Sequence, residues 1–280
     1  MKDFESLLVD WTVEDPFYDR VFGGLKDRTI TALLRSREEG CLAGIPFSDK
    51  AVQALGIEAR WKKESGADIA AGEEIARFRG TPGPIVRLEN LIIGLIGKSS
   101  GIASAAQRAK KAARGRVHLV SGGWKKHPFL IKEIIREAVT SGGLETRILD
   151  QPFLYLDKNY VRIFGGISQA LRAVAKDPAP KVIQVRGEFA SIDTEAYEAI
   201  RNGASVLMVD TGSWEDLDRV LRVIKEEGAS PGVKSAFAGG IRTEDIPALT
   251  EKGVDILDIG GEILDAPWLE LSYDVLREGK

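Results

Sequence analysis

One cysteine, two histidines and no long apolar run characterise this 280-residue sequence, and each shortage excludes a class of protein. Because Cys41 is the only cysteine, neither an internal disulfide nor a cysteine-rich metal site is possible. His118 and His127 are too few for a multi-histidine metal site. The longest apolar candidate, Leu91–Ile96, is far too short to cross a membrane. We interpret Cys41, in the strand-like stretch E-E-G-C-L-A-G-I, as a buried structural thiol.

A strong charge of either sign is also missing, since the formal net charge is −3 at pH 7. This gives no reason to expect a nucleic-acid partner attracted by bulk electrostatics. Hydrophobic residues make up 44% and charged residues 29% of the chain, as in soluble globular proteins. The first residues, M-K-D-F-E-S-L-L, contain no signal-peptide core, so we expect a cytoplasmic protein with no membrane association.

The first hundred residues predict a small domain of mixed structure. After a short amphipathic segment, Phe4–Trp11, the stretch R-T-I-T-A-L-L-R-S alternates polar and apolar residues with the period of a half-buried strand. C-L-A-G-I predicts another strand, and Asp49–Leu55 a short helix. Glycines then mark turns around further short strands. We interpret residues 1–103 as an open α+β domain.

Two helices are predicted next, one beginning at Pro84 and apolar on nearly all sides, and one opening at S-G-I-A-S. From Arg116 onward, strands alternate with helices, which implies parallel strand pairing. The predicted strands are Val117–Val120, Glu145–Leu149, Phe153–Leu156, Val182–Val185, Val206–Val209, Ser235–Ala238 and Asp255–Ile259. The predicted helices are Phe129–Val139, Ile167–Ala175, Thr194–Asn202, Trp214–Glu227 and Thr243–Lys252.

This alternation predicts an α/β fold, with an incomplete (β/α) barrel of about six to seven parallel strands over residues 104–267. Such a domain is similar to a TIM barrel that lacks full closure. A closing helix over Trp268–Arg277, within residues 268–280, is predicted to return to the first domain.

Paired glycines follow the last two predicted strands, Gly239–Gly240 in A-F-A-G-G-I and Gly260–Gly261 in D-I-G-G-E-I. Loops after the last two strands of (β/α) barrels often form a phosphate site. Glycine suits such a turn because the backbone must approach the ligand closely. The alternative is that the glycines only end the strands. We predict a phosphorylated ligand here.

Cations follow the first barrel strand in S-G-G-W-K-K-H-P. Lys125 and Lys126 are predicted to bind a polyanion, and His127 to position or protonate a ligand. The alternative is a solvated basic turn, with His127 capping the helix that Pro128 starts.

Other strand ends add further charged candidates. Arg147 is predicted to lie within a strand, where it needs a carboxylate or phosphate partner. Lys158 is a second candidate ligand, although a surface turn explains it nearly as well. Glu188 and Asp210 follow neighbouring strands and suit a ligand that carries Mg²⁺ or hydroxyls. Asp210 has the alternative role of capping the helix near Trp214. Together with the glycine turns, these residues favour phosphoribosyl pyrophosphate chemistry over a sugar-phosphate isomerase or aldolase, in which the first hundred residues have no role.

The sequence resembles the quinolinate/nicotinate phosphoribosyltransferase (nicotinate-nucleotide pyrophosphorylase) superfamily over nearly its whole length. The most specific match is L-E-N-L-I-I-G-L-I-G-K-S-S-G-I-A-S, which is similar to the family's long helix leading into S-G-I-A-T. A-F-A-G-G-I resembles the S-G-G-I turn, G-V-D-I-L-D-I-G-G resembles the G-V-D-x-I-S-x-G turn, and E-E-G-C-L-A-G-I resembles a strand of the first domain.

The resemblance implies a pentosyltransferase of NAD biosynthesis. Such an enzyme moves ribose 5-phosphate from phosphoribosyl pyrophosphate to a pyridine carboxylate, quinolinate or nicotinate, giving nicotinate mononucleotide and pyrophosphate. By resemblance, Glu188 and Asp210 hold the ribose and Mg²⁺ and act in catalysis with Lys126. Gly239, Gly240, Gly260 and Gly261 hold the 5′-phosphate. The family's dimers complete each site with the partner's first domain, so a homodimer is expected.

The acceptor half of the site departs from the family pattern. Glu89–Asn90 stands where quinolinate enzymes usually have Glu-Arg, and Lys125–Lys126 replaces an Arg–Lys pair. G-G-L-E-T-R keeps Arg147 but has Thr146 where a histidine is expected, and D-K-N-Y replaces K-D-N-H, with Lys158 displaced by one position. The acceptor therefore stays open between quinolinate, nicotinate and another heteroaromatic compound. A protein that binds a phosphorylated nucleotide without turnover is the remaining alternative.

Overall fold

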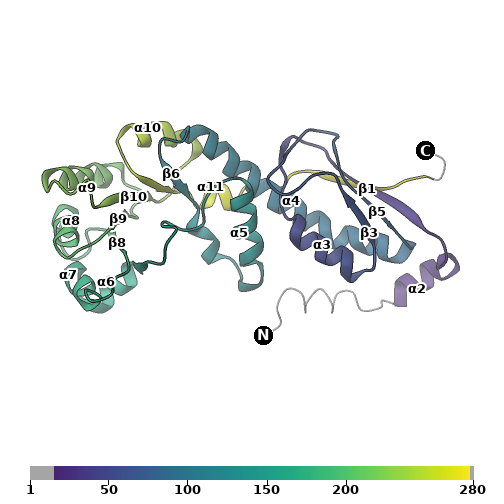
Figure 1. Cartoon of the computed structure of the whole chain (residues 1–280), viewed down its shortest axis with the longest axis horizontal. Helices are drawn as coiled ribbons and strands as arrows, with labels where there is room; N and C mark the ends of the chain where they lie inside the picture. The colour runs from purple at the N-terminus through teal and green to yellow at the C-terminus, as the bar shows by residue number, and fades with distance from the viewer. Residues whose placement is uncertain (1–15, 278–280) are drawn as a thin grey trace. The chain divides into compact units, whose positions relative to one another are not determined.

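The computed structural model describes residues 16–277, which fall into two compact units. The first unit holds the chain up to Gln107, Trp124–Leu144, and the chain from Ile263 onward. The second holds Arg108–Gly123 and Glu145–Glu262. Figure 1 shows the elements of both. No helix within residues 16–277 is long and apolar enough to cross a membrane.

An antiparallel sheet forms the centre of the first unit, with strand order β12-β1-β5-β3. Its strands are β12 (Leu271–Val275), β1 (Ile30–Ser36), β5 (Glu74–Gly80) and β3 (Glu58–Trp61), while β2 (Gly40–Cys41) and β4 (Asp68–Ile69) pair separately. The helical elements are α2 (Pro16–Phe22), η1 (Gly23–Leu25), α3 (Ile45–Ala54), η3 (Phe129–Ile131), α5 (Lys132–Ser141) and most of α4 (Pro82–Ala113).

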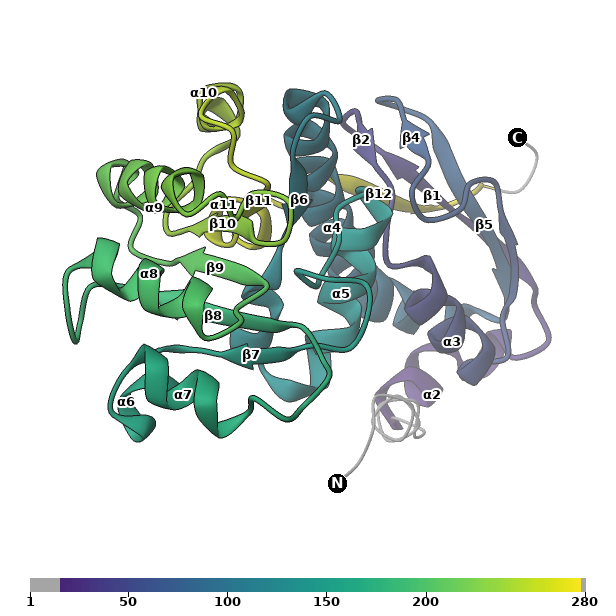
Figure 2. The same ribbon diagram turned by 60° about the vertical axis from the view of Figure 1, so that its left-hand side comes forward.

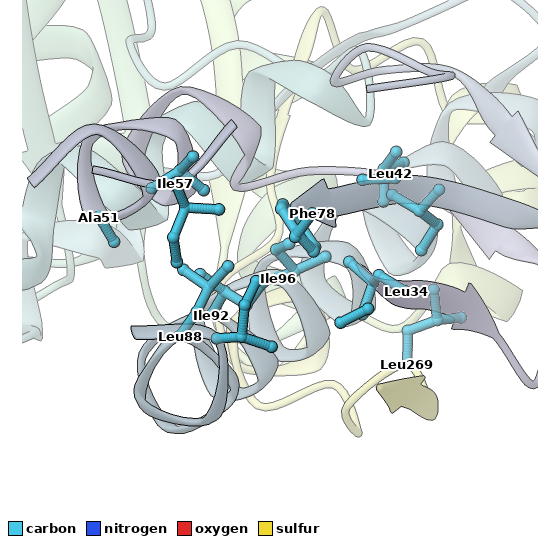
Figure 3. Close-up of a cluster of buried hydrophobic side chains, with 14 of the residues drawn as sticks. Leu34, Leu42, Ala51, Ile57, Phe78, Leu88, Ile92, Ile96 and Leu269 are labelled. Atoms are coloured by element: carbon cyan, nitrogen blue, oxygen red, sulfur yellow. The ribbon is translucent and has the colours of Figure 1, made fainter. Parts of the chain in front are cut away.

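The core of this unit lies between the sheet and α4. Leu88, Ile92 and Ile96 recur every four residues, so they lie on one face of α4 and are fully buried. Figure 3 shows these side chains pointing toward Phe78 and Leu34 of the sheet. The alternation of β1 and β5 thus supplies the apolar face that the helix covers.

The second unit is built on a six-stranded parallel sheet with order β6-β11-β10-β9-β8-β7. Its strands are β6 (His118–Val120), β7 (Leu154–Leu156), β8 (Lys181–Val185), β9 (Val206–Val209), β10 (Lys234–Ala238) and β11 (Ile256–Asp258). The helical elements are α6 (Lys158–Phe164), α7 (Ile167–Ala173), α8 (Ile192–Arg201), α9 (Trp214–Glu226), η4 (Thr243–Asp245) and α10 (Ile246–Glu251). η2 (Gly122–Lys126) and α11 (Gly261–Leu264) cross the division between the units.

Helices α6, α7, α8 and α9 lie on one side of strands β8 and β9 (Figures 1 and 2). The prediction of an α+β first domain, followed by an incomplete barrel of about six to seven parallel strands, is confirmed, since the parallel sheet has six strands. β6 and β7 are the two edges of the parallel sheet, so it is an incomplete barrel rather than a closed one.

The prediction of a closing helix over Trp268–Arg277 is wrong, because Leu271–Val275 forms strand β12. This segment pairs antiparallel with β1, and Tyr273 stacks on Phe78 with 5.8 Å between the ring centroids. The alternating pattern L-S-Y-D-V suits a strand that covers an open sheet edge.

Four further expectations differ from the structure. The two helices predicted after Pro84 are one helix, α4, of 32 residues. Glu145–Leu149 is not a strand, since only Glu145 makes a single parallel bridge, with Val120. C-L-A-G-I contributes only Cys41 to a strand, and α3 begins four residues before the predicted Asp49. The amphipathic segment Phe4–Trp11 lies outside the described residues.

Glycines within α4 allow close packing rather than a break. A Cβ at Gly101 would overlap the carbonyl oxygen of Pro267, and one at Gly97 would lie 3.1 Å from the carbonyl oxygen of Leu269. The chain that enters β12 therefore runs directly against α4. Glycine removes the side chain that would prevent this approach.

We expect Gly101→Ala to destabilise the protein by about 1–3 kcal/mol or more, because its Cβ has no space beside Pro267. Gly83→Ala in the same helix is the matched control, since its Cβ would meet no atom closer than 3.9 Å. The control is expected to be neutral or to stabilise by up to about 1 kcal/mol. Denaturant unfolding monitored by circular dichroism measures both, and equal effects of the two changes would contradict the packing argument.

Candidate active site

Polar side chains form a layer at the carboxyl ends of the parallel strands, above an apolar cluster. Gln184 lies two residues beyond Val182 in β8, and Asp210 two residues beyond Met208, so each shares a face with a core residue. Asp258 in β11 is likewise two residues beyond Ile256. The apolar cluster below this layer consists of Val120, Ile148, Val182, Val206, Met208, Ala236, Ala238 and Ile256.

Gln184 connects three parts of this layer. Its Nε2 donates to the hydroxyl of Tyr155 and to Oδ2 of Asp210, each at 3.0 Å. Its Oε1 accepts from the backbone N–H of Lys158 at 2.8 Å. Only 7% of Gln184 is exposed, so these bonds fix both its orientation and the position of Asp210. Burial, with Asp258 and Asp210 nearby, raises the pKa of Tyr155, so its phenol stays protonated.

Two arginines hold the carboxylate of Glu188. Arg162 donates from Nε to Oε2 at 2.7 Å and from Nη2 to Oε1 at 2.8 Å, a two-bond pairing. Arg186 donates from Nε to Oε1 at 3.2 Å. The hydrogen bonds from Arg162 lower the pKa of Glu188 most, and Arg186 acts in the same direction. Glu188 is therefore ionised throughout the neutral range.

Arg186 also contacts Asp210. Its Nη1 lies 3.3 Å from Oδ2 of Asp210 and donates a short hydrogen bond to the backbone carbonyl oxygen of the same residue. One guanidinium group thus bridges the two predicted acids, which follow the neighbouring strands β8 and β9. The structure therefore brings Glu188 and Asp210 together, but through a cation of the chain itself.

The loop that carries Arg186 and Glu188 is anchored by a buried carboxylate. Glu195 is 2% exposed and accepts three backbone hydrogen bonds, from Arg186 at 2.9 Å, Gly187 at 2.8 Å and Phe189 at 2.9 Å. Gly187 has a φ of +71°, which glycine adopts without strain. Glu195 thereby replaces water as the acceptor for three N–H groups and sets the path of the loop.

The glycine turn after β10 lies against the turn after β9. Gly212 donates its N–H to the carbonyl oxygen of Ala238 at 3.1 Å. A Cβ at Gly239 would lie 2.5 Å from the nitrogen and 2.7 Å from the Cα of Gly212, and the φ of Gly239 is +114°. Only glycine fits at this point, for steric and conformational reasons together.

The two predicted phosphate turns line one pocket in the second unit. Gly240 and Gly261 both contribute to it, and the complete lining is Arg108, Ala112, Gly240, Ile241, Arg242, Thr243, Glu244, Pro247, Gly261 and Glu262. The carboxylate of Glu262 accepts the backbone N–H of Thr243 at 3.0 and 3.1 Å, which links the two turns. The neighbouring positions of the turns agree with the sequence prediction, whereas their binding of a phosphate stays a prediction.

The predicted cations are distributed over both units. Lys125 and Lys126 are exposed in η2, and His127 follows as a partly buried residue whose N–H bonds the carbonyl oxygen of Trp124. All three belong to the first unit, so their action on the same ligand as Asp210 stays a prediction. The alternative role of His127 as a helix cap is wrong, because neither η3 nor α5 has a side-chain cap.

Arg147 and Lys158 lie in the second unit and are both exposed. The guanidinium of Arg147 lies 5.4 Å from the ring centroid of Phe153, in a segment that is not a strand. The predicted burial of Arg147 in a strand is therefore wrong, and a phosphate or carboxylate partner stays a prediction. Lys158 is the first residue of α6, which Asp157 caps through the N–H groups of Asn159 and Tyr160.

The alternative role of Asp210 as a helix cap is also wrong, because Ser213 caps α9 by accepting the N–H of Asp216. Sequence reasoning missed Gln184, Arg186, Arg162 and Glu195. A signal was present for two of them, since Gln184 interrupts the apolar strand K-V-I-Q-V and Arg186 directly follows it. Arg162 and Glu195 lie on helices and show no such signal.

The carboxylates of Glu188 and Asp210, with their present hydrogen-bond partners, do not fit a bound magnesium ion. Within the part of the chain that the structure describes, no group of three or more His, Cys, Asp or Glu residues is arranged to hold a metal. Both oxygens of Glu188 accept from arginines, and Oδ2 of Asp210 is shared by Gln184 and Arg186. Glu188 and Asp210 therefore do not by themselves form a metal site.

An antiparallel unit, an open parallel sheet and paired glycine turns at its carboxyl edge together define a two-unit class of α/β proteins. Residues 8–100 match the N-terminal domain, and residues 102–274 the C-terminal domain, of quinolinate phosphoribosyl transferase. These matches cover most of the chain. The chain belongs to the quinolinate phosphoribosyl transferase family.

Curated relatives match nearly end to end. The nicotinate-nucleotide pyrophosphorylase [carboxylating] of Homo sapiens is 28% identical over 255 residues, which cover 88% of this chain and 82% of the human protein. A probable nicotinate-nucleotide pyrophosphorylase [carboxylating] of Methanothermobacter thermautotrophicus is 29% identical over 268 residues, covering 92% and 94%. The matches thus include both domains of each relative.

Solved structures share the fold at lower identity. The nicotinate-nucleotide pyrophosphorylase from Francisella tularensis superimposes with a TM-score of 0.75 and 21% identity, covering 99% of this chain and 100% of its own. That from Ehrlichia chaffeensis has a TM-score of 0.83 and 15% identity, covering 98% and 99%. At these identities the likeness shows the fold alone.

We expect Gly239→Ala to destabilise the second unit more than Gly253→Ala does. Both glycines have positive φ, +114° and +85°, so each substitution carries a strain of about 1–2 kcal/mol. Only the Cβ at position 239 meets backbone atoms, whereas that at position 253 meets nothing within 4 Å. Thermal unfolding of the two variants compares them, and equal midpoints would contradict the close approach of the turns.

Glu195→Ala is expected to cost about 2–4 kcal/mol, because three N–H groups lose a charged acceptor. Glu198→Ala on the same helix is a matched control, since its carboxylate bonds Ser168 outside the loop. Hydrogen exchange of residues 186–189 should increase in the first variant only. Unchanged exchange in Glu195→Ala would show that the loop is held by other contacts.

Proposed function

We propose that this protein transfers ribose 5-phosphate from phosphoribosyl pyrophosphate to quinolinate and forms nicotinate mononucleotide, pyrophosphate and carbon dioxide, a step of NAD biosynthesis. The supporting observation is the family match over both domains, with relatives of one shared name covering most of each chain. The paired glycine turns and the carboxylates at the sheet edge lie where such a ligand is expected.

The proposed reaction replaces one bond at the anomeric carbon of the ribose by another. The bond from C1′ to the diphosphate oxygen breaks, and its electrons leave with pyrophosphate. The ring nitrogen of quinolinate donates its lone pair to C1′, and the nucleotide formed loses the neighbouring carboxylate as carbon dioxide while the ring carbon gains a proton. The transition state carries positive charge on the ribose, so fixed negative charge beside the ribose and positive charge at the diphosphate lower the barrier.

The acidic residues are proposed to act on the ribose, and the turns on its 5′-phosphate. Asp210, held by Gln184 and Arg186, is proposed to accept a hydrogen bond from a ribose hydroxyl and to stabilise the positive ribose. Glu188 is expected to assist there. The N–H groups of the turns at Gly239–Gly240 and Gly260–Gly261 are proposed to hold the 5′-phosphate.

The cations are proposed to bind the anionic ends of the two substrates. Lys125 and Lys126, with Lys126 closest to the departing diphosphate, balance its charge, and His127 positions it. Arg147 and Lys158 are proposed to face the carboxylates of the pyridine. These assignments rest on the resemblance and on the exposure of the side chains.

Three finer features belong to the same proposal. Magnesium is proposed to enter with the diphosphate of the substrate, because Mg²⁺ is commonly bound through substrate phosphates. A homodimer and a cytoplasmic location follow from the resemblance. Sedimentation of the purified protein tests the homodimer. The expected mass is twice the chain mass of 30.5 kDa.

Incubation with phosphoribosyl pyrophosphate, Mg²⁺ and quinolinate is expected to yield nicotinate mononucleotide, detected by mass, together with pyrophosphate. Nicotinate in a parallel reaction tests the other pyridine acid. Asp210→Asn is expected to lower kcat/KM about 100-fold, through loss of a charge beside the reacting ribose. Asp218→Asn is the matched control, because Asp218 pairs with Lys252 on the surface.

No nucleotide from either acid would refute the proposed acceptor class. Binding of phosphoribosyl pyrophosphate without release of pyrophosphate would favour the non-catalytic alternative. Equal losses in Asp210→Asn and Asp218→Asn would refute the role of Asp210.

A further inference from the structure

The acid pair at the sheet edge is neutralised inside the chain. Arg186 reaches Glu188 through Nε at 3.2 Å and Asp210 through Nη1 at 3.3 Å. Arg162 adds a second guanidinium, bonded to both oxygens of Glu188. Two carboxylates thus meet two guanidinium groups, and the cluster carries no net charge without any ion.

Arg186 is fixed in this position by the fold around it. Its backbone N–H bonds Glu195, the same buried carboxylate that accepts from Gly187 and Phe189. Its Nη1 also bonds the backbone carbonyl oxygen of Asp210, at the end of the neighbouring strand. The backbone of Arg186 is thus held by Glu195 of α8, and its guanidinium by the carbonyl oxygen of Asp210, directly after β9, besides the two carboxylates. Arg186 is therefore held in place by the fold and is not a freely solvated surface charge.

A divalent ion would compete with Arg186 for the same oxygens. Mg²⁺ binds carboxylate oxygens at about 2.0–2.1 Å and favours near-octahedral geometry. Arginine does not lose its proton in proteins, so its charge and donors persist at every working pH. An ion between Glu188 and Asp210 would have to displace the guanidinium and leave it beside a second positive charge.

We infer that Arg186 is a built-in cation that occupies the place between Glu188 and Asp210 which the resemblance assigns to a divalent metal. It donates to both carboxylates and holds them in place, so it is a positioning residue for them. The protein without substrates then has no metal site at this edge. The inference rests on the proposed function only in assigning these two acids to the ligand site.

Titration of the free protein with Mn²⁺, followed by electron paramagnetic resonance, tests the inference without either substrate. The wild-type protein is expected to show no saturable Mn²⁺ site. Arg186→Met removes the cation but keeps much of the side-chain volume, and it is expected to gain one saturable site per chain. Adding Asp210→Asn to this variant should abolish the gain.

Arg201→Met is the matched control, because Arg201 pairs with Glu227 at 3.2 Å on an exposed surface and bridges no second acid. It is expected to gain no site. Saturable Mn²⁺ binding by the wild-type protein that Asp210→Asn abolishes would overturn the inference. A folded Arg186→Met protein, verified by circular dichroism, that gains no site would overturn it too. If Arg186→Met does not fold, the wild-type titration alone decides.

The proposed function and the role of Arg186 can be refuted independently of each other. Absence of nucleotide in the activity assay refutes the acceptor proposal but leaves the Mn²⁺ titration interpretable. A wild-type Mn²⁺ site refutes the role of Arg186 even when the enzyme is active.

Discussion

The carboxylate of Glu195 sets the geometry of the candidate site, although it is buried and faces no substrate. Three N–H donors just after β8 converge on it, and an N–H group without a partner there would be costly. The bend that results turns Arg186 toward Asp210 and places Glu188 beside Arg162. A single charged acceptor below the loop thus determines how the charges above it meet.

Parallel pairing supplies the second constraint. Side chains alternate between the two faces of a strand, so residues two positions apart share a face. Gln184 therefore lies on the same face as the buried Val182, and Asp210 on the same face as the buried Met208. The apolar cluster and the polar layer are therefore successive levels of one packed interior. Gly239 and Gly212 add a close backbone contact that side chains would prevent. The glycine turns and the two acids consequently lie at one edge of the sheet.

The arrangement also explains how this chain differs from the pattern it resembles. The two glycine turns keep their sequence and line a common pocket, while the acids meet arginines. A site built in this way pairs its acids with fixed guanidinium groups, which need no ion from solution. By resemblance, the departures at Asn90 and Thr146 belong to the acceptor half of the site and not to the phosphoribosyl half.

Much of the fold was predictable from local patterns. The runs V-I-Q-V and V-L-M-V, bounded by turn signals, became β8 and β9 almost residue for residue. L-S-Y-D-V was misread as helix because an alternating segment becomes a strand only when an open edge, here β1, is available to pair. The two helices predicted after Pro84 form one helix, α4, and its Gly101 allows the close approach of Pro267, which no local pattern shows.

The site divides in the same way. The placement of Glu188, Asp210 and the glycine turns at one edge of the sheet was predictable from sequence alone, since residues that follow parallel strands gather there. Their roles stay predictions. The sequence by itself determined the fold class, these strand ends and the family resemblance. Only the tertiary structure decided which charges pair, because Arg186 lies 24 residues from Asp210, and Arg162 26 residues from Glu188. Ion pairs over such separations form only when strands align in register, and no local pattern encodes that alignment.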